Sequence, residues 1–167
     1  PEDPGQAIEV KPEHVEALLN VAVSHYDFVI LDVGRILDAV TIKALDRANY
    51  VFPVMQLTLP FVRDATRLIA AFRTLGYSRE KIRLLVNRLE RSSELKLHDV
   101  EHSLGLTAYK TLPNSYEAVA AAVNQGRAIA SFARNNPVCK GLRELAQDLS
   151  PPSTEGAGML GKLLRRG

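Results

Sequence analysis

The chain has 167 residues, of which 46% are hydrophobic and 24% are charged. This composition excludes a disordered acidic chain and a fibrous protein, and the length allows one domain of about 150 residues with a tail. The formal charge is only +2, with the surplus of positive charge after residue 150, which argues against a broad basic face for nucleic acid.

The single cysteine and the apolar stretches indicate the cellular compartment of the protein. Cys139 excludes an internal disulfide, and we expect it to pack as a small apolar side chain. The longest apolar stretch, near residues 51–62, is interrupted by prolines and polar residues, and the first residues lack the pattern of a signal peptide. We therefore expect a cytoplasmic protein.

The first predicted elements are a helix and a strand. Apolar residues recur at helical spacing from Pro12, which suits a first helical turn, and the helix is expected to end at residues 26–27. The apolar run 28–31, closed by Asp32, is typical of a strand buried on both faces of a parallel sheet. A loop is expected over residues 33–38.

Strands and helices then alternate along the chain. Further strands are predicted near residues 50–55, 82–86 and 108–112, and further helices near residues 39–47, 61–75, 95–104, 116–124 and 138–149. Such alternation favours parallel strands joined by right-handed helical crossovers. The predicted class is α/β, with about four parallel strands and flanking helices.

The chain divides by composition into a core region and two ends. Residues 1–11 are expected to form an irregular lead-in, residues 12–149 the α/β domain, and residues 150–158, rich in Pro, Ser and Gly, a flexible linker. Residues 159–167 form a short basic tail that is amphipathic if helical.

The tail has two interpretations, and its residues favour neither. One side of a helix would carry Met159, Leu160, Leu163 and Leu164, and the other Lys162, Arg165 and Arg166. This pattern suits a weak anchor to an anionic membrane or to a partner protein. The alternative is a disordered tail in which the pattern arises by chance.

Polar residues follow three of the predicted strands, where open α/β sheets bind ligands. They are Asp32, Asn87, and Pro113 with Asn114. A carboxylate at such a strand end can orient Mg²⁺ or a water bound to it. The alternative for an isolated apolar strand followed by Asp is a side chain that caps the next turn.

Six segments together resemble the C-terminal two thirds of MinD/ParA-type P-loop ATPases, and are most similar to the CpaE/TadZ branch. Residues 26–32 read Tyr-Asp-Phe-Val-Ile-Leu-Asp, residues 84–88 read Leu-Leu-Val-Asn-Arg, and the others are 45–48, 56–65, 112–114 and 122–126. The resemblance covers about residues 12–149 in uninterrupted order. It implies the P-loop NTPase fold, and the branch is associated with assembly and polar placement of Flp/Tad pili.

The resemblance also implies roles for the residues at the strand ends. Asp32 matches the Walker B aspartate, which acts on Mg²⁺ through a bound water. Asn87 matches the asparagine that reads adenine, since a carboxamide offers both a donor and an acceptor, and Pro113 and Asn114 match the loop on the other side of the base. The alternative for Asn87 is a turn residue that caps the strand end.

The chain departs from the family pattern at the phosphates. No glycine-rich loop of the form Lys-Gly-Gly-x-Gly-Lys-Thr occurs in it; this loop and the first switch region would lie upstream. Val33-Gly34-Arg35 stands where many relatives have Thr-Pro-Pro, and Arg35 is interpreted equally well as a phosphate contact or a solvated side chain. We expect the complete protein to bind ATP and Mg²⁺, and this chain alone to be inactive.

The family arrangement places the phosphate-loop strand beside the Walker B strand. Without that strand, residues 28–31 are expected to form an exposed apolar strand edge, which is an association hazard. Either an upstream part supplies that strand, or the chain pairs with something that covers this edge.

The leading functional hypothesis is an ATP-binding MinD/ParA-like homodimer that acts in assembly or polar localisation of Flp/Tad-type pili. It implies pilus-assembly proteins as partners, and peripheral contact at the inner membrane or cell pole through the tail. One alternative is a non-hydrolysing localisation scaffold, favoured by the missing phosphate loop. The other is a ParA-like DNA-segregation ATPase, disfavoured by the balanced charge of residues 1–150.

One segment of the chain resembles a zinc-binding motif. Residues 98–102 read His-Asp-Val-Glu-His, which matches the inverted zincin pattern. A catalytic zinc needs a third protein ligand, and the resemblance places this helix in a surface crossover. The hypothesis of a zinc site is therefore set aside.

Overall fold

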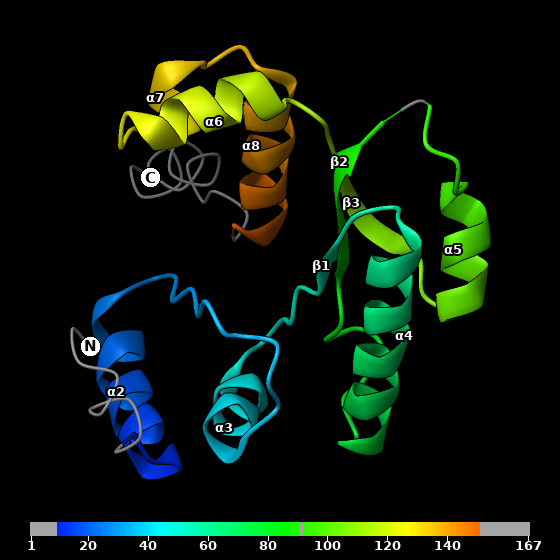
Figure 1. Ribbon diagram of the computed structural model, residues 1–167. Helices are drawn as coiled ribbons and strands as arrows, with labels where there is room; N and C mark the ends of the chain where they lie inside the picture. Colours follow the sequence, from blue (N-terminus) through cyan, green and yellow to red (C-terminus); the bar gives the residue numbers. More distant parts are fainter. Residues whose placement is uncertain (1–9, 91, 151–167) are drawn as a thin grey trace, which may run out of the picture. The chain divides into compact units, whose positions relative to one another are not determined.

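The computed structural model describes residues 10–90 and 92–150 (Figure 1). These residues divide into two compact units. The first unit consists of residues 10–51 with Glu80–Ile82, and the second consists of Phe52–Arg79 with the described residues from Arg83 to 150.

The first unit is built on helices α2 (Pro12–His25) and α3 (Ala39–Arg47). Leu19 of α2 and Ala44 and Leu45 of α3 are buried. Beside them, the Lys43 ammonium lies 3.1 Å from a Glu16 carboxylate oxygen. Apolar burial and an ion pair therefore both link the two helices.

Helix α3 begins at a side-chain cap. The Asp38 carboxylate accepts a hydrogen bond of 2.8 Å from the Thr41 backbone N–H, which satisfies a donor that the first helical turn leaves without a partner. This bond lowers the pKa of Asp38.

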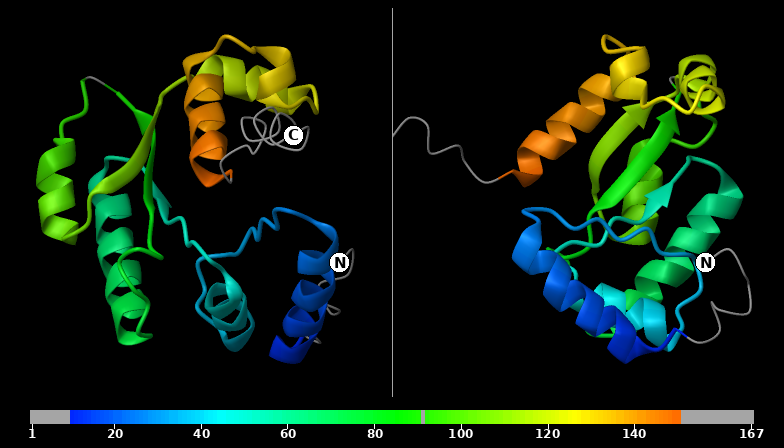
Figure 2. Two further views of the ribbon diagram at one scale, coloured as in Figure 1. Left: turned by 180° about the vertical axis from the view of Figure 1, so that it is seen from behind. Right: turned by 90° about the vertical axis from the view of Figure 1, so that its left-hand side faces the viewer.

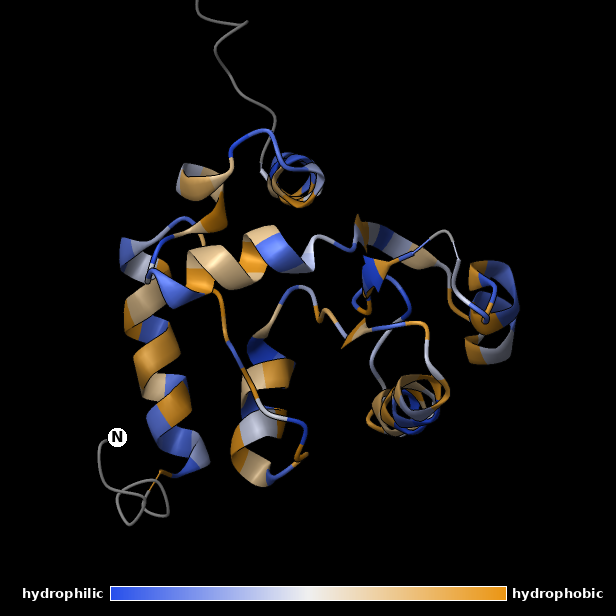
Figure 3. Cartoon of the chain, turned by 45° about the horizontal axis from the view of Figure 1, so that its top comes forward, coloured by the Kyte–Doolittle hydropathy of each residue, from blue (hydrophilic) through white to orange (hydrophobic). Residues whose placement is uncertain are grey.

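The strand predicted over residues 28–31 is not present, and that prediction is wrong. Residues 28–31 carry no β-bridge, and no hydrogen bond joins their backbone to another described residue. Phe28 and Ile30 are 54% and 92% exposed, and Figure 3 shows the apolar colouring of this stretch between α2 and α3. An apolar run becomes a strand only where a neighbouring backbone completes the ladder.

The second unit contains a parallel sheet of three strands in the order β1 (Val54–Met55), β2 (Leu84–Leu89) and β3 (Ala108–Pro113). Val54 pairs with Leu85. The α/β class with a parallel sheet and flanking helices is confirmed. Of the segment predicted as a strand over 50–55, Val54 and Met55 form β1, and Val51 forms a separate parallel bridge to Ile82 within the first unit.

Five helices belong to the second unit. They are α4 (Leu59–Thr74), α5 (Leu97–Leu104), α6 (Tyr116–Asn124), α7 (Ile129–Phe132) and α8 (Pro137–Leu149). Helix α7 is the one that the sequence pattern did not predict. In the left view of Figure 2, α8 lies on the opposite side of β2 and β3 from α4 and α5.

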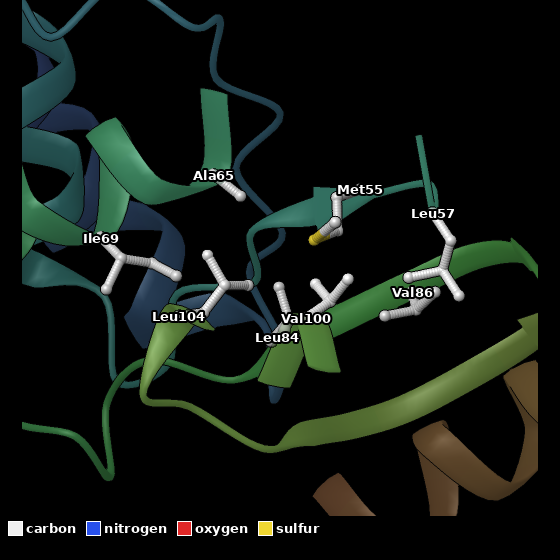
Figure 4. Close-up of a cluster of buried hydrophobic side chains, with 8 residues drawn as sticks. All are labelled: Met55, Leu57, Ala65, Ile69, Leu84, Val86, Val100 and Leu104. Carbon is white, nitrogen blue, oxygen red and sulfur yellow. The ribbon is translucent and has the colours of Figure 1, made fainter. Parts of the chain in front are cut away.

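The main apolar core lies between the sheet and helices α4 and α5 (Figure 4). Leu84 and Val86 of β2 are fully buried in it. Its other members are Met55, Leu57, Ala65, Ile69, Val100 and Leu104. Burial of such side chains contributes about 1.5–3 kcal/mol each, so this cluster fixes the positions of the strands.

Each of the two longer strands contains one extra residue. Leu84 pairs with Ala108 but Leu85 pairs with Lys110, so Tyr109 forms a bulge in β3. In an unbulged ladder, Lys110 would point with Val86 into the apolar core. Because of the bulge it points to α8, where its ammonium lies 3.4 Å from carboxylate oxygens of Glu144 and Asp148.

These carboxylates also affect the protonation of Lys110. Partial desolvation acts to lower the pKa of Lys110, but the hydrogen bonds and charges of Glu144 and Asp148 outweigh it and raise the pKa. Lys110 therefore stays charged, and it links β3 to α8.

Among the described residues, no helix is both long enough and apolar enough to cross a membrane.

Candidate functional site

The second bulge lies at the carboxyl end of β2 and contains Asn87 and Arg88. Val86 pairs with Thr111, and Leu89 pairs with Pro113, so two residues of β2 face one residue of β3. Leu89 thereby packs against the apolar core, and the Arg88 side chain is exposed instead. A regular strand would turn Arg88 toward the apolar core and Leu89 away from it, and the bulge reverses this arrangement.

The backbone at Arg88 has an uncommon conformation. Its φ is 51°, the one positive φ at a non-glycine position among the described residues. Such a conformation costs about 1–3 kcal/mol and persists only where the surroundings hold it. In the same bulge, the Arg88 N–H donates a hydrogen bond of 2.9 Å to the Oδ1 atom of Asn87.

The loop after β3 is attached to this end of β2. The Asn114 N–H donates to the Leu89 carbonyl at 3.1 Å, and the Asn114 side-chain amide donates to the Glu90 carboxylate. Pro113 and Asn114 therefore lie beside the end of β2. Asn87, Pro113 and Asn114 meet at one end of the sheet.

Helix α6, which follows this loop, also contacts the bulge. The Arg88 guanidinium carbon lies 5.6 Å from the ring centroid of Tyr116, the first residue of α6. Both side chains are exposed. This is a cation–π contact between the end of β2 and the start of α6.

The carboxamide of Asn87 remains available to a ligand. Its Oδ1 atom accepts from Arg88, and no described residue accepts a hydrogen bond from its Nδ2 atom. Two donor hydrogens and one acceptor lone pair are therefore open. The side chain can therefore donate to an acceptor atom of a ligand.

Asp32 and Arg35 belong to the first unit, whereas Asn87, Pro113 and Asn114 belong to the second. Asp32 is exposed and lies in the irregular segment 26–38. No described residue bonds to its carboxylate, which leaves both oxygens open to water or to a cation.

The tail residues Met159, Leu160, Lys162, Leu163, Leu164, Arg165 and Arg166 lie outside the described residues.

The string His98 to His102 lies on α5 and is used structurally. The Nε2 atom of His98 lies 2.8 Å from the Asp99 carboxylate, and the Glu101 carboxylate accepts from the Ala108 N–H at the start of β3. In the part of the chain that the structure describes, no group of three metal-binding side chains occurs.

Comparison with known proteins gives one curated relative and several similar structures. No family model matches the chain. Over 143 residues, 83% of this chain, it is 27% identical to the septum site-determining protein MinD of Thermotoga maritima. Among solved structures, a ParA family ATPase from Chlorobium tepidum superposes with a TM-score of 0.83 at 23% identity. MinD of Pyrococcus horikoshii, solved with Mg-ADP, superposes with a TM-score of 0.72 at 14% identity.

This chain has the MinD/ParA P-loop ATPase fold. The matches cover 89% and 94% of it for the ParA and the P. horikoshii structures. The chain spans about half the length, 52%, of the curated MinD and 62% of each of these structures.

Two features of this candidate site were not found from the sequence. They are the bulge at Arg88 and the contact of Arg88 with Tyr116. The run Leu-Leu-Val-Asn-Arg-Leu does contain a signal, because an unbulged strand would place Arg88 on the same face as Leu84 and Val86, and Leu89 on the other face. Tyr116 carries no comparable signal, since a tyrosine in the first turn of a helix is commonplace.

Proposed function

We propose that the chain is the base-binding part of an ATP-binding protein of the MinD/ParA type. The observation that carries the proposal is the position of Asn87 beside Pro113 and Asn114 at the carboxyl ends of β2 and β3. Ligands of open α/β sheets bind at this edge. The open Nδ2 donor of Asn87 suits an acceptor nitrogen of adenine.

We further propose that Asp32 holds Mg²⁺ through a bound water. Mg²⁺ retains several waters and needs only one or two carboxylates, and Asp32 offers an accessible carboxylate without a described partner. The ion would supply positive charge beside the nucleotide phosphates. Arg35, also exposed, is a second candidate phosphate contact.

The proposed cellular role is assembly or polar localisation of Flp/Tad-type pili, as a homodimer that contacts pilus-assembly proteins. Its support is the similarity of the strand-end segments to the CpaE/TadZ branch. Contact with the inner membrane or cell pole would come from the tail at residues 159–167.

A second candidate is a non-hydrolysing localisation scaffold. Val33-Gly34-Arg35 after Asp32 differs from the Thr-Pro-Pro of many relatives, and these residues are exposed. A scaffold would bind nucleotide without positioning a water for hydrolysis.

The test starts with the coding sequence upstream of Pro1, read for Lys-Gly-Gly-x-Gly-Lys-Thr. ATP binding by the encoded protein is then measured by calorimetry, with Asn87→Ala as the variant and Asn135→Ala, an exposed asparagine elsewhere, as the control. We expect Mg²⁺-dependent binding that Asn87→Ala weakens about tenfold. Binding without hydrolysis supports the scaffold, and no binding by the wild type refutes the proposal.

A further inference from the structure

The strained backbone at Arg88 has few contacts to hold it. Within its own strand, the Asn87 side chain binds the Arg88 N–H. From outside the strand, the Tyr116 ring lies against the Arg88 guanidinium. Asn114 binds Leu89 and Glu90, and these contacts fix the strand beyond the bulge. The Arg88 side chain is contacted by Tyr116 instead.

The Arg88 N–H determines how the Asn87 carboxamide is oriented. With Oδ1 toward this N–H, the carboxamide accepts a hydrogen bond and presents its Nδ2 hydrogens outward. Turning the carboxamide by half a turn would bring two donors together and break the bond. The orientation therefore persists while the bulge holds the peptide between Asn87 and Arg88 in this position.

We propose that Arg88 and Tyr116 form a positioning pair that holds the Asn87 carboxamide with its donor toward the base. This inference rests on the proposed function, because it assigns a purpose to the orientation of Asn87. In this proposal the pair acts through Asn87. The guanidinium–ring contact stabilises the bulge, the bulge presents the Arg88 N–H, and the N–H orients Asn87.

The pair also couples two elements that would lie on either side of the base. Arg88 belongs to β2, and Tyr116 begins the helix that follows Pro113 and Asn114. Loss of the contact would loosen the loop at Pro113 together with Asn87. Weaker base binding is then expected even though Asn87 itself is unchanged.

The test uses the 167-residue chain, with adenosine as the probe because it reports base recognition without phosphates. NMR follows two signals: hydrogen exchange of the Arg88 amide without ligand, and the shift of the Asn87 side-chain amide during an adenosine titration. The variants are Tyr116→Ala, Arg88→Ala and the double variant. Tyr116→Phe, which keeps the ring, and Val123→Ala, an exposed position near the other end of α6, are the controls.

We expect Tyr116→Ala and Arg88→Ala each to speed hydrogen exchange of the backbone amide at position 88 and to weaken adenosine binding about two- to fivefold. The double variant should lose no more than either single variant, and both controls should behave as the wild type. Unfolding curves verify that the variants remain folded, as the exposure of both side chains leads us to expect.

Two results overturn the inference in different ways. If wild-type adenosine binding shifts Asn87 but Tyr116→Ala leaves that binding unchanged, the positioning role is wrong and the adenine site stands. If adenosine does not shift Asn87 in the wild type, the adenine site and the positioning role both fail.

Discussion

The Cδ2 atom of Leu112 in β3 lies 2.7 Å from the position that a Cβ atom on Gly141 of α8 would occupy. A methyl group there would require the Leu112 side chain to shift, although it is only 7% exposed. The backbone of α8 thus approaches β3 closely, and the Lys110 ion pairs with Glu144 and Asp148 lie on the same two elements.

Gly141→Ala is expected to be neutral or destabilising by up to about 2 kcal/mol. The better helix propensity of alanine contributes about 1 kcal/mol, and overpacking against Leu112 costs about 1–3 kcal/mol. In a Leu112→Ala background the clash disappears, so the same substitution should stabilise. Urea unfolding of the four proteins measures this coupling. Equal stabilisation by Gly141→Ala in both backgrounds would contradict the close approach.

The cap of α3 should make stability depend on pH. The Thr41 N–H bond holds the pKa of Asp38 below its usual 3.8, so the stabilisation is complete above that value and is lost as the pH falls through the folded-state pKa. Asp38→Asn keeps a capping oxygen and should remove this part of the acid sensitivity. Unfolding curves at decreasing pH check it, with Asp27→Asn, an exposed carboxylate outside the helices, as the control. An unchanged acid profile for Asp38→Asn would argue against the cap.

The exposed apolar segment at Phe28 and Ile30 should promote self-association. Both its side chains and its backbone groups are open to a second chain. We expect the average mass in sedimentation equilibrium to rise with concentration for the wild type, and to stay near 18.4 kDa for Phe28→Lys/Ile30→Lys. Val123→Lys, at an apolar residue 69% exposed in the second unit, is the matched control. A wild type that remains monomeric at high concentration would refute this.

The 167-residue chain is expected to bind ATP more weakly than micromolar. Contacts to the base leave the phosphate charge uncompensated in a sequence without a glycine-rich phosphate loop. Calorimetric titration with and without Mg²⁺ measures the affinity. Micromolar, Mg²⁺-dependent binding would mean that other residues of this chain recognise phosphate.

The tail at residues 159–167 is expected to bind anionic membranes weakly. Four apolar residues and three cations support attachment, but ordering the segment offsets much of the gain. Co-sedimentation with anionic and neutral liposomes compares the intact chain with one that ends at Ser150. Salt-sensitive binding that truncation abolishes supports an anchor, and equal sedimentation of both chains contradicts it.

The helices could be predicted because their signals are local. Residues 116–124 were expected to be helical and form α6 with these bounds. Residues 95–104 were expected to be helical, and α5 ends at Leu104; the next residue, Gly105, has a φ of 61°, the left-handed conformation that suits a glycine after a helix. Helix α7 was missed because its four residues are too few to show a period.

The strands were harder to predict because a ladder depends on partners distant in the sequence. Composition predicted a strand at residues 28–31, but composition cannot supply the neighbour that a strand needs. Residues 82–86 were expected to end a strand before Asn87, yet β2 continues to Leu89 through the bulge. The proximity of Asn87 and Pro113 did follow from parallel strands, and their roles in binding remain predictions.

The bulges at Tyr109 and at Asn87 with Arg88 have a consequence for chain length. β2 and β3 each contain one residue more than their pairing requires. Loss of one residue at either bulge would therefore make the strand regular, and every later side chain would stay on the same face of the sheet. Loss of one residue elsewhere in β2 or β3 would turn the following side chains to the wrong face. Shortening by one residue is therefore expected to be tolerated at Tyr109, whereas at Arg88 it would also remove the side chain that contacts Tyr116.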